Sequence, residues 1–331
     1  MTKPLNRVRL EHVAERAGVS RALASLALRG QPGVLPEKRK LILQAAAELN
    51  YVPNLAARSL ASNGSRTIGV VVREIESPFL AALAKAIDKS GRKESLSVLL
   101  SISAEDDASA EASVQAMLGQ VAGVILIDTP RDEEAISRIA LQVPTIYLGR
   151  HLMTPNISCV SNDDDFGARS VARHLLSLGH RKIAHITGGS GSGARRRMAG
   201  FEAELAEQGV KPMIVPGDYS IDAGAQGVDA LLKMPERPTA VFAANDQVAL
   251  GALNRLLSAG LSVPGDMAVV GYDDMPLAAT EAINLTTVRQ PIEALADRSI
   301  AAILDRIANP EAPATRTMVS PELVVRRSTK T

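Results

Sequence analysis

The stretch 10–28 constrains the fold of this chain more than any other part. Val13 and Ala17 stand at helical spacing, and Gly18 then supplies the residue type that takes positive φ at a helix end. Ser20 follows as a good N-cap for a second helix. Two short helices joined by so tight a turn predict a helix-turn-helix, a motif whose second helix enters the major groove of DNA.

Two further helical segments follow this motif. Residues 36–50 carry apolar side chains at the spacing of a third helix. Residues 54–60 form a short helix-capable segment, in which Asn54 can cap the helix and the small Ala57 lets two such helices approach closely. A helix of fewer than ~12 residues is marginal on its own, so we expect this one to depend on a partner. Residues 63–65, Asn-Gly-Ser, are expected to form a flexible joint.

Charge is distributed unevenly along the chain. The whole sequence has 37 Lys and Arg against 36 Asp and Glu, a net charge of +1. Residues 1–66 hold 11 of the basic and 4 of the acidic residues, so this part carries +7 and the remainder −6. A basic head on an acidic body is typical of a polyanion-binding module attached to a separate sensor. A length of 331 residues likewise predicts two or three folding units.

From residue 67 onward, short apolar runs alternate with amphipathic stretches, which is typical of βαβ units and a parallel sheet. Strands are expected at 68–72, 97–101, 124–127, 145–148, 183–187, 239–243 and 267–271. Helices are expected near 78–90, 107–119, 133–141, 166–178, 195–208, 223–232, 246–259 and 292–308. This order fits two successive doubly wound halves, and a ligand would bind at the carboxyl ends of their strands.

Taken together, the head and the core resemble the LacI/GalR family of bacterial transcription regulators. The matching residues are Val13-Ala14, Ala17-Gly18-Val19-Ser20-Arg21, Ser25, Tyr51-Val52-Pro53-Asn54, Ala57-Arg58-Ser59-Leu60 and Thr67-Ile68-Gly69. The resemblance implies an α/β protein with an all-α helix-turn-helix head and a hinge helix. The core would be periplasmic-binding-protein-like, with two doubly wound parallel-sheet subdomains.

The domain boundaries follow from the same resemblance. The head would span 1–53, the hinge helix and linker 54–66, and the effector-binding core 67–331. Within the core, the N-subdomain would comprise about 67–162 and 291–319, and the C-subdomain about 163–290 and 320–331.

The resemblance also implies which residues contact DNA. They are Ser20, Arg21, Ala22, Ser25, Leu26, Asn54, Ala57 and Leu60. Arg21 can bind O6 and N7 of guanine, and Leu60 would be a wedge inserted through the minor groove. Leu23 and Leu26 stand where the family often has Thr and Arg. Core packing and DNA contact are about equally expected for Leu23, whereas DNA contact is favoured for Leu26. An ordinary helix-packing face remains the alternative at the hinge.

Residues in loops after strands are implied to bind a small-molecule effector. They are Glu74, Phe79, Arg150, Arg197, Tyr219, Asn245 and Asp273. A guanidinium fork, an amide and a carboxylate suit vicinal hydroxyls, which both donate and accept hydrogen bonds. The resemblance implies a sugar or a sugar derivative as the effector.

Three further features depart from the family pattern. Leu35 replaces the usual Ser or Thr N-cap of the third helix, and a lost cap costs about 1 kcal/mol. Gly149 replaces a frequent Asp after the fourth strand. The glycine-rich loop 188–193 lacks side chains that some members use. The last two departures leave the class of effector open.

An enzyme is the first alternative interpretation. The loop 188–193 follows a strand, and Arg195 to Arg197 could bind a phosphate at a helix N-terminus. However, the loop matches neither a P-loop nor a dinucleotide-binding fingerprint, and the five His residues have no metal-binding spacing. We therefore predict no enzyme activity, no cofactor and no metal site. A secreted solute-binding protein, the second alternative, conflicts with the basic head and the lack of a signal peptide.

The remaining expectations concern compartment and assembly. The single cysteine, Cys159, has the neighbours of a buried strand and fits a reducing cytoplasm. No segment approaches the roughly 20 apolar residues of a membrane span. The C-terminal region lacks the leucine heptads of a coiled-coil tetramer, so we expect a homodimer on a near-palindromic operator. A repressor is the usual role in the family.

Overall fold

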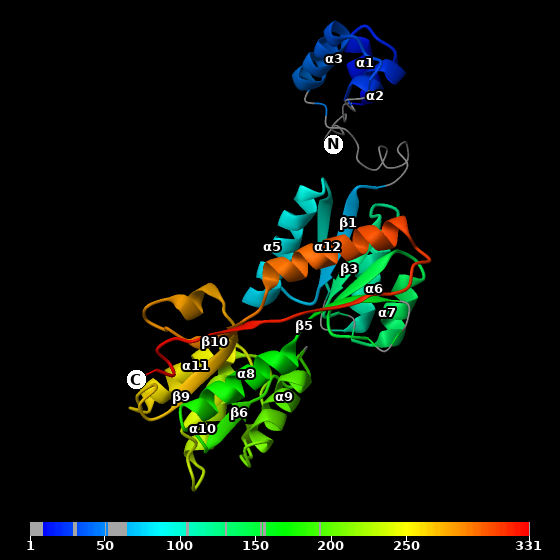
Figure 1. The fold of residues 1–331 in the computed structure, drawn as a ribbon. Helices are drawn as coiled ribbons and strands as arrows, with labels where there is room; N and C mark the ends of the chain where they lie inside the picture. The colour runs from blue at the N-terminus through cyan, green and yellow to red at the C-terminus, as the bar shows by residue number, and fades with distance from the viewer. Residues whose placement is uncertain are drawn as a thin grey trace, which may run out of the picture. The chain divides into compact units, whose positions relative to one another are not determined.

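The computed structural model describes most of the chain. The described residues are 9–28, 32–49, 51, 65–103, 106–129, 131–152, 154, 157–191 and 193–330. The chain divides into two compact units, residues 1–65 and 66–331 (Figure 1). The predicted hinge residues Asn54, Ala57 and Leu60 lie outside the described residues.

The head has the predicted helix-turn-helix. Helices α1 (Leu10–Arg16) and α2 (Arg21–Leu28) are followed by α3 (Pro36–Glu48). Gly18 has a φ of +63° in the turn, and the Ser20 hydroxyl accepts a hydrogen bond from the Leu23 amide at 3.2 Å. The three helices enclose a small core, to which each contributes buried side chains. Its buried members are Val13, Ala14, Ala24, Ala27, Val34, Ile42, Ala45 and Ala46.

The first subdomain of the larger unit is built on a six-stranded parallel sheet. Its strands lie in the order β11-β5-β4-β3-β1-β2. Their bounds are β1 (Thr67–Val72), β2 (Ser97–Ile102), β3 (Gly123–Ile127), β4 (Thr145–Gly149), β5 (Ser158–Asn162) and β11 (Arg316–Val319). In the register of the sheet, Val70 of β1 is paired with Leu100 on one side and Ile125 on the other.

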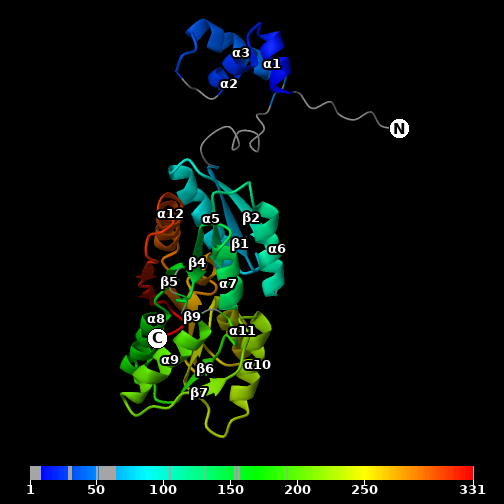
Figure 2. The ribbon, with the colours of Figure 1, turned by 90° about the vertical axis from the view of Figure 1, so that its right-hand side faces the viewer.

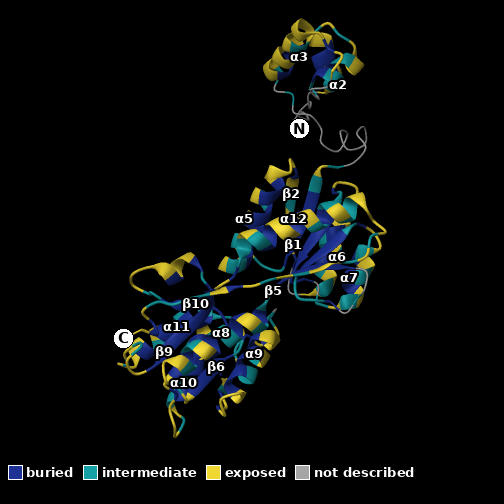
Figure 3. Cartoon of the chain, viewed as in Figure 1, coloured by how far each residue is buried: buried dark blue, intermediate teal, exposed yellow. Residues whose placement is uncertain are grey.

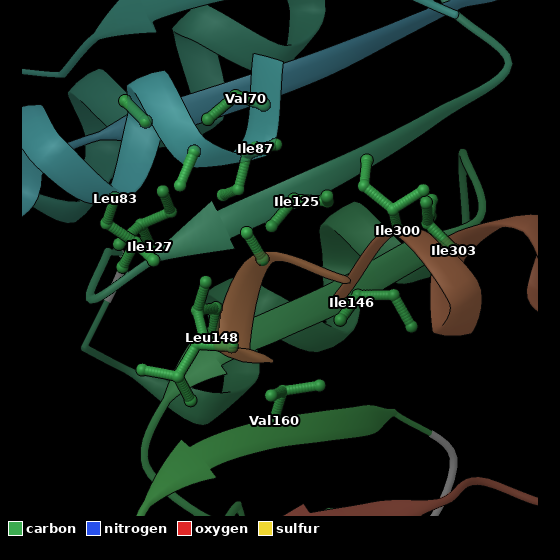
Figure 4. Packing of buried hydrophobic residues seen from close by; sticks show 14 of the residues in the cluster. Val70, Leu83, Ile87, Ile125, Ile127, Ile146, Leu148, Val160, Ile300 and Ile303 are labelled. Carbon is green, nitrogen blue, oxygen red and sulfur yellow. The ribbon is translucent and has the colours of Figure 1, made fainter. Parts of the chain in front are cut away.

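Helices cover both faces of this sheet. Helices α5 (Pro78–Lys93) and α12 (Ile292–Ala308) pack on one face, where Leu83 and Ile300 belong to the same buried cluster as Ile125 (Figure 4). Helices α6 (Asp107–Met117) and α7 (Glu133–Ala140) pack on the opposite face. Because both faces are covered, β3 is buried at every residue, as Figure 3 shows for the central strands.

The second subdomain repeats this plan. Its strands lie in the order β12-β10-β9-β8-β6-β7, with β12 antiparallel and the others parallel. Their bounds are β6 (Ile183–Ile186), β7 (Met213–Val215), β8 (Ala240–Ala243), β9 (Ala268–Asp273), β10 (Thr286–Arg289) and β12 (Glu322–Val324). One face is covered by α8 (Asp164–Ser177) and α9 (Ala194–Ala206), the other by α10 (Ile221–Leu232) and α11 (Asp246–Ser258), as Figure 2 shows. A short 3-10 helix, Pro276–Ala279, follows β9.

The chain crosses between the two sheets three times. It passes from β5 into α8, returns from β10 to α12, and crosses once more between β11 and β12. None of the helices in the described ranges has the length and apolar character needed to cross a bilayer. The predicted fold class is confirmed: an all-α head precedes two doubly wound subdomains.

Candidate functional site

The N-terminal end of α2 presents an exposed polar surface on the head. Ser20, Arg21 and Ala22 are exposed, and Ser25 is half-buried one turn further along. Arg21 lies 3.2 Å from Glu11, but its side chain is 70% exposed. Exposed ion pairs of this kind contribute little free energy, so the guanidinium can exchange Glu11 for a phosphate or a base. The placement is compatible with the predicted contacts to DNA, which remain predictions.

Leu23 and Leu26 lie at the edge of the core of the head. The side chains of Leu23 and Leu26 are both half-buried and pack against the core of the head. The reason is geometric: α2 contacts both α1 and α3, so positions three residues apart on its inner side face the core. Part of each side chain stays accessible, so this packing is compatible with the DNA contact predicted for Leu26, which remains a prediction. The contacts predicted for Asn54, Ala57 and Leu60 cannot be placed, because these residues lie outside the described ranges.

A cavity of about 670 Å³ lies between the two subdomains, and we call it the interdomain cavity. Its lining follows the carboxyl ends of strands in both sheets, where parallel α/β proteins bind ligands. The first subdomain contributes Arg73, Glu74, Glu76, Ser77, Phe79, Leu80, Leu83, Ile127, Asp128, Arg131, Leu148, Gly149, Asn162 and Leu295. The second contributes Asp164, Gly188, Ser190, Gly191, Arg197, Asp218, Tyr219, Ser220, Ile221, Asp222, Asn245, Gln247, Asp273 and, just after β10, Gln290.

Six of the seven predicted effector residues line this cavity. They are Glu74, Phe79, Arg197, Tyr219, Asn245 and Asp273. The seventh, Arg150, does not. Its guanidinium lies 3.0 Å from the Glu133 carboxylate and donates to the Arg131 carbonyl oxygen at 2.6 Å. Arg150 directly follows the end of β4, and these two contacts hold its side chain against the start of α7 and the loop before it. Arg150 instead fixes the loop that carries Arg131, which does line the cavity.

Arg197 is the best-anchored cation in the cavity lining. Its Nε donates to Asp164 at 2.9 Å and its Nη1 to the Ala244 carbonyl oxygen at 2.6 Å. The guanidinium carbon also lies 3.6 Å from the centroid of the Tyr272 ring, within the range of a cation–π contact. These contacts hold the planar group in one orientation, as a binding site for hydroxyls requires.

Asn245 and Asp273 are held by the ends of their own elements. Asn245 caps α11 by accepting from the Val248 amide at 2.9 Å, and its Nδ2 donates to the Tyr219 carbonyl oxygen at 3.3 Å. Asp273 ends β9 with a φ of +117°, a backbone conformation that residues other than glycine rarely adopt. Its Oδ1 accepts from Gln290 at 2.6 Å. Burial raises the pKa of Asp273 above its ordinary value.

The glycine-rich loop lies against the ring of Tyr219. A Cβ on Gly188 would stand 2.3 Å from the ring Cε1, and one on Gly191 would stand 2.0 Å from Cε2. Side chains at both positions would therefore collide with the ring. Between them, Ser190 accepts a hydrogen bond of 2.9 Å from Arg131 of the first subdomain. The loop thus positions an aromatic ring and joins the two subdomains.

Several cavity residues were missed in the sequence. The polar ones with low exposure are Asp128, Asn162, Asp164 and Gln290. Two of them stand where cavity residues are expected, at the carboxyl end of a strand: Asp128 directly follows β3, and Asn162 ends β5. Among the residues that the structure describes, no three His, Cys, Asp or Glu side chains come together in a group that could hold a metal ion.

A helix-turn-helix head followed by a core of two doubly wound subdomains defines a class of DNA-binding transcription regulators. Comparison with known families agrees. The profile described as "Bacterial regulatory proteins, lacI family" matches residues 9–54, and that of a "Periplasmic binding protein-like domain" matches residues 172–329. The chain belongs to the LacI family and is a DNA-binding transcriptional repressor, not an enzyme.

Similar proteins span nearly the whole chain. A ribose operon repressor of Halalkalibacterium halodurans is 33% identical, covering 97% of this chain and 97% of its own. A lac repressor dimer bound to operator and the anti-inducer ONPF has a TM-score of 0.88 at 31% identity, covering 98% and 99%. A LacI-family regulator from Enterococcus faecium with bound ribose has a TM-score of 0.72 at 28% identity, covering 80% and 98%.

Proposed function

We propose that a sugar or sugar derivative binds in the interdomain cavity and controls the affinity of this repressor for its operator DNA. The convergence of Arg197, Asn245 and Asp273 on one cavity carries the proposal. These three side chains are buried and fixed by protein contacts, so they can bind hydroxyls without a large loss of side-chain entropy. The ribose-bound relative supports a carbohydrate effector.

Control of DNA binding would come from the arrangement of the two subdomains. A ligand that contacts both subdomains favours one relative orientation, and residues 54–60 would pair as hinge helices in only one such orientation of a dimer. A ligand can change operator affinity only by its differential affinity for the two states, typically 1–3 kcal/mol. The operator-bound lac repressor dimer supports a homodimer on a near-palindromic site. Because a repressor acts where the chromosome lies, we propose a cytoplasmic location.

At the operator, we propose that Arg21 reads a base while Ser20 and Ser25 bind phosphates. Arg21→Ala should weaken specific binding by about 1–3 kcal/mol and relax the preference at one base pair. Arg237→Ala is the matched control, because Arg237 is exposed in the core. Gel-shift titrations on operator and scrambled DNA measure both effects. Unchanged affinity and selectivity in Arg21→Ala would contradict this placement of the reading helix.

Operator titration with and without a sugar that binds the core tests the effector site. Arg197→Ala and Asp273→Ala should abolish the response to the sugar, while operator binding without sugar stays near normal. Arg197→Lys serves as a second variant in case the alanine variant fails to fold. Lysine keeps a cation beside the buried Asp164 carboxylate. Arg237→Ala should respond like the wild type. A retained response in both cavity variants would show that the effector binds elsewhere.

A further inference from the structure

The lining of the interdomain cavity is strongly acidic. Its described residues include seven carboxylates, on Glu74, Glu76, Asp128, Asp164, Asp218, Asp222 and Asp273. They include three guanidiniums, on Arg73, Arg131 and Arg197. The excess of carboxylates over guanidiniums matters most for the deepest groups, because charges interact more strongly where water is excluded.

The buried cation of the cavity is already compensated. Arg197 and Asp164 form an ion pair of 2.9 Å in which the two side chains are 6% and 5% exposed. Asp128 and Asp273 add two further buried carboxylates to the lining. At the edge, Arg73 lies 3.7 Å from Glu74, and Arg131 donates to Ser190. A ligand entering the cavity therefore meets a negative potential.

A second observation concerns hydrogen bonding. Asn162 lines the cavity and is 6% exposed, and its Oδ1 is buried without a hydrogen-bond partner. Its Nδ2 donates to Asp164 at 3.0 Å and to the Tyr272 hydroxyl at 2.7 Å. This orientation of the amide is fixed, because the opposite one would turn Oδ1 toward the Asp164 carboxylate. Asn162 thus brings a buried acceptor without a partner to the lining of the cavity, and an unsatisfied buried acceptor is costly.

We propose that the effector is a polyol without negative charge, either a neutral sugar or an amino sugar, and that its phosphorylated and carboxylated derivatives are rejected. Hydroxyl and ammonium groups donate hydrogen bonds to carboxylate and amide oxygens, whereas phosphate and carboxylate groups only accept and are repelled. The inference rests on the proposed function, in which the effector occupies this cavity.

A screen of the full-length protein by thermal shift and calorimetry tests the inference. The neutral probes are glucose, galactose, mannose and ribose. Each hexose is also tested as its 2-amino form, its 6-phosphate and its uronate, and ribose is also tested as its 5-phosphate. The tightest binder should be a neutral or amino sugar, bound ~30-fold or more tightly than its anionic derivatives. A sugar phosphate or sugar acid as the tightest binder would overturn the inference, and so would a screen without a neutral or amino binder.

Charge-neutralising variants connect this selectivity to the cavity. Asp128→Asn should reduce the discrimination against the anionic derivative by about 5-fold or more, because one buried negative charge is removed. Glu311→Gln is the control, since Glu311 is exposed and does not line the cavity. Equal discrimination in wild type and Asp128→Asn would contradict the inference. Unchanged sugar binding in Arg197→Ala would contradict the proposed binding site. If the tightest binder is an anion and Arg197→Ala abolishes its binding, the site is correct and only the inference about ligand charge is wrong.

Discussion

At the scale of single residues, Gly188 and Gly191 lack side chains because the ring of Tyr219 occupies the space that a Cβ would need. The glycine-rich loop could be seen in the sequence, but its cause could not, since the ring comes from a position 28 residues or more further along the chain. Gly188 also has no positive φ, so conformational freedom does not explain it. Close approach of the ring does.

Gly188→Ala should therefore lower the free energy of unfolding by about 1–3 kcal/mol, because the ring must move. In a Tyr219→Ala background the same substitution should cost much less, since no ring remains to collide. Urea denaturation of the four proteins in this double-mutant cycle gives the coupling. Gly91→Ala is the control, because its Cβ would meet only ordinary contacts of 3.6 Å or more. Additive effects of the two substitutions would contradict the proposed contact.

Asp246 gives a prediction on pH at the same scale. Its carboxylate is buried and accepts hydrogen bonds from Thr287 at 2.6 Å and from the Met275 amide at 2.8 Å. Burial, and secondly the charge of Asp273, raise the pKa of Asp246. Because the folded-state pKa lies above the unfolded one, this group stabilises the fold fully only below about pH 4, and the contribution is lost as the pH rises through the folded pKa.

Asp246→Asn should remove the loss of folding stability that the ionisation of Asp246 causes as the pH rises. An amide can accept from the Met275 amide and donate to the Thr287 hydroxyl, so the hydrogen bonds can be kept. Relative to wild type, the variant should gain stability as the pH rises from about 5 to about 8. Urea unfolding at several pH values measures the difference. A constant difference across this range would show that Asp246 does not titrate as described.

At the scale of secondary structure elements, prediction succeeded where burial gives a clear pattern. Each of the seven expected strands has a counterpart in the structure. Six of them are almost wholly buried, because both faces of a central parallel strand are covered, whereas β2 lies at the edge of its sheet and is not buried. The short strands β7, β10, β11 and β12 were not predicted. β11 alternates between exposed and half-buried residues and β12 has three residues, so neither has an apolar run to recognise. Arg150 does not line the cavity, because it contacts Glu133 and Arg131, and these contacts could not be predicted from the sequence.

The start of α3 has no side-chain N-cap, as expected for a leucine at this position, and the predicted loss of stability can be tested. Leu35 is the N-cap residue, it accepts no side-chain hydrogen bond, and its side chain is 72% exposed. Leu35→Ser should supply an oxygen to an amide of the first turn and stabilise the helix by about 1 kcal/mol. Hydrogen exchange in the full-length protein should then show ~5-fold greater protection of the amide of Lys38.

Leu43→Ser is the control for this variant. Leu43 is also exposed, but it lies in the middle of α3. The substitution makes the same change in polarity without a cap, so protection should stay the same or fall, because Ser is a weaker helix former than Leu. Equal gains in both variants would show that polarity, and not capping, is responsible.

At the scale of the whole molecule, the two subdomains are joined by three crossings of the chain and share one cavity. The sequence predicted that residues after strands of both sheets line this cavity, because parallel strands end at a common edge. It could not predict contacts across the cavity, which depend on how the two subdomains face each other. The hydrogen bond from Arg131 to Ser190 is one such contact. Arg131 is itself held by Arg150 and by Asp107, which accepts from its backbone amide at 2.8 Å.

Ser190→Ala should weaken the arrangement in which the subdomains approach each other at this edge. One hydrogen bond contributes about 0.5–1.5 kcal/mol, so the affinity for a sugar that binds the cavity should fall by up to ~10-fold. Operator binding without sugar should change little, because the substitution leaves the head intact. Ser190→Thr keeps the hydroxyl and should retain most of the affinity, which separates the hydrogen bond from a general effect on the loop. Calorimetry with the sugar and operator titration measure the two quantities. Equal sugar affinity in wild type and Ser190→Ala would show that this bridge does not stabilise the ligand-bound arrangement.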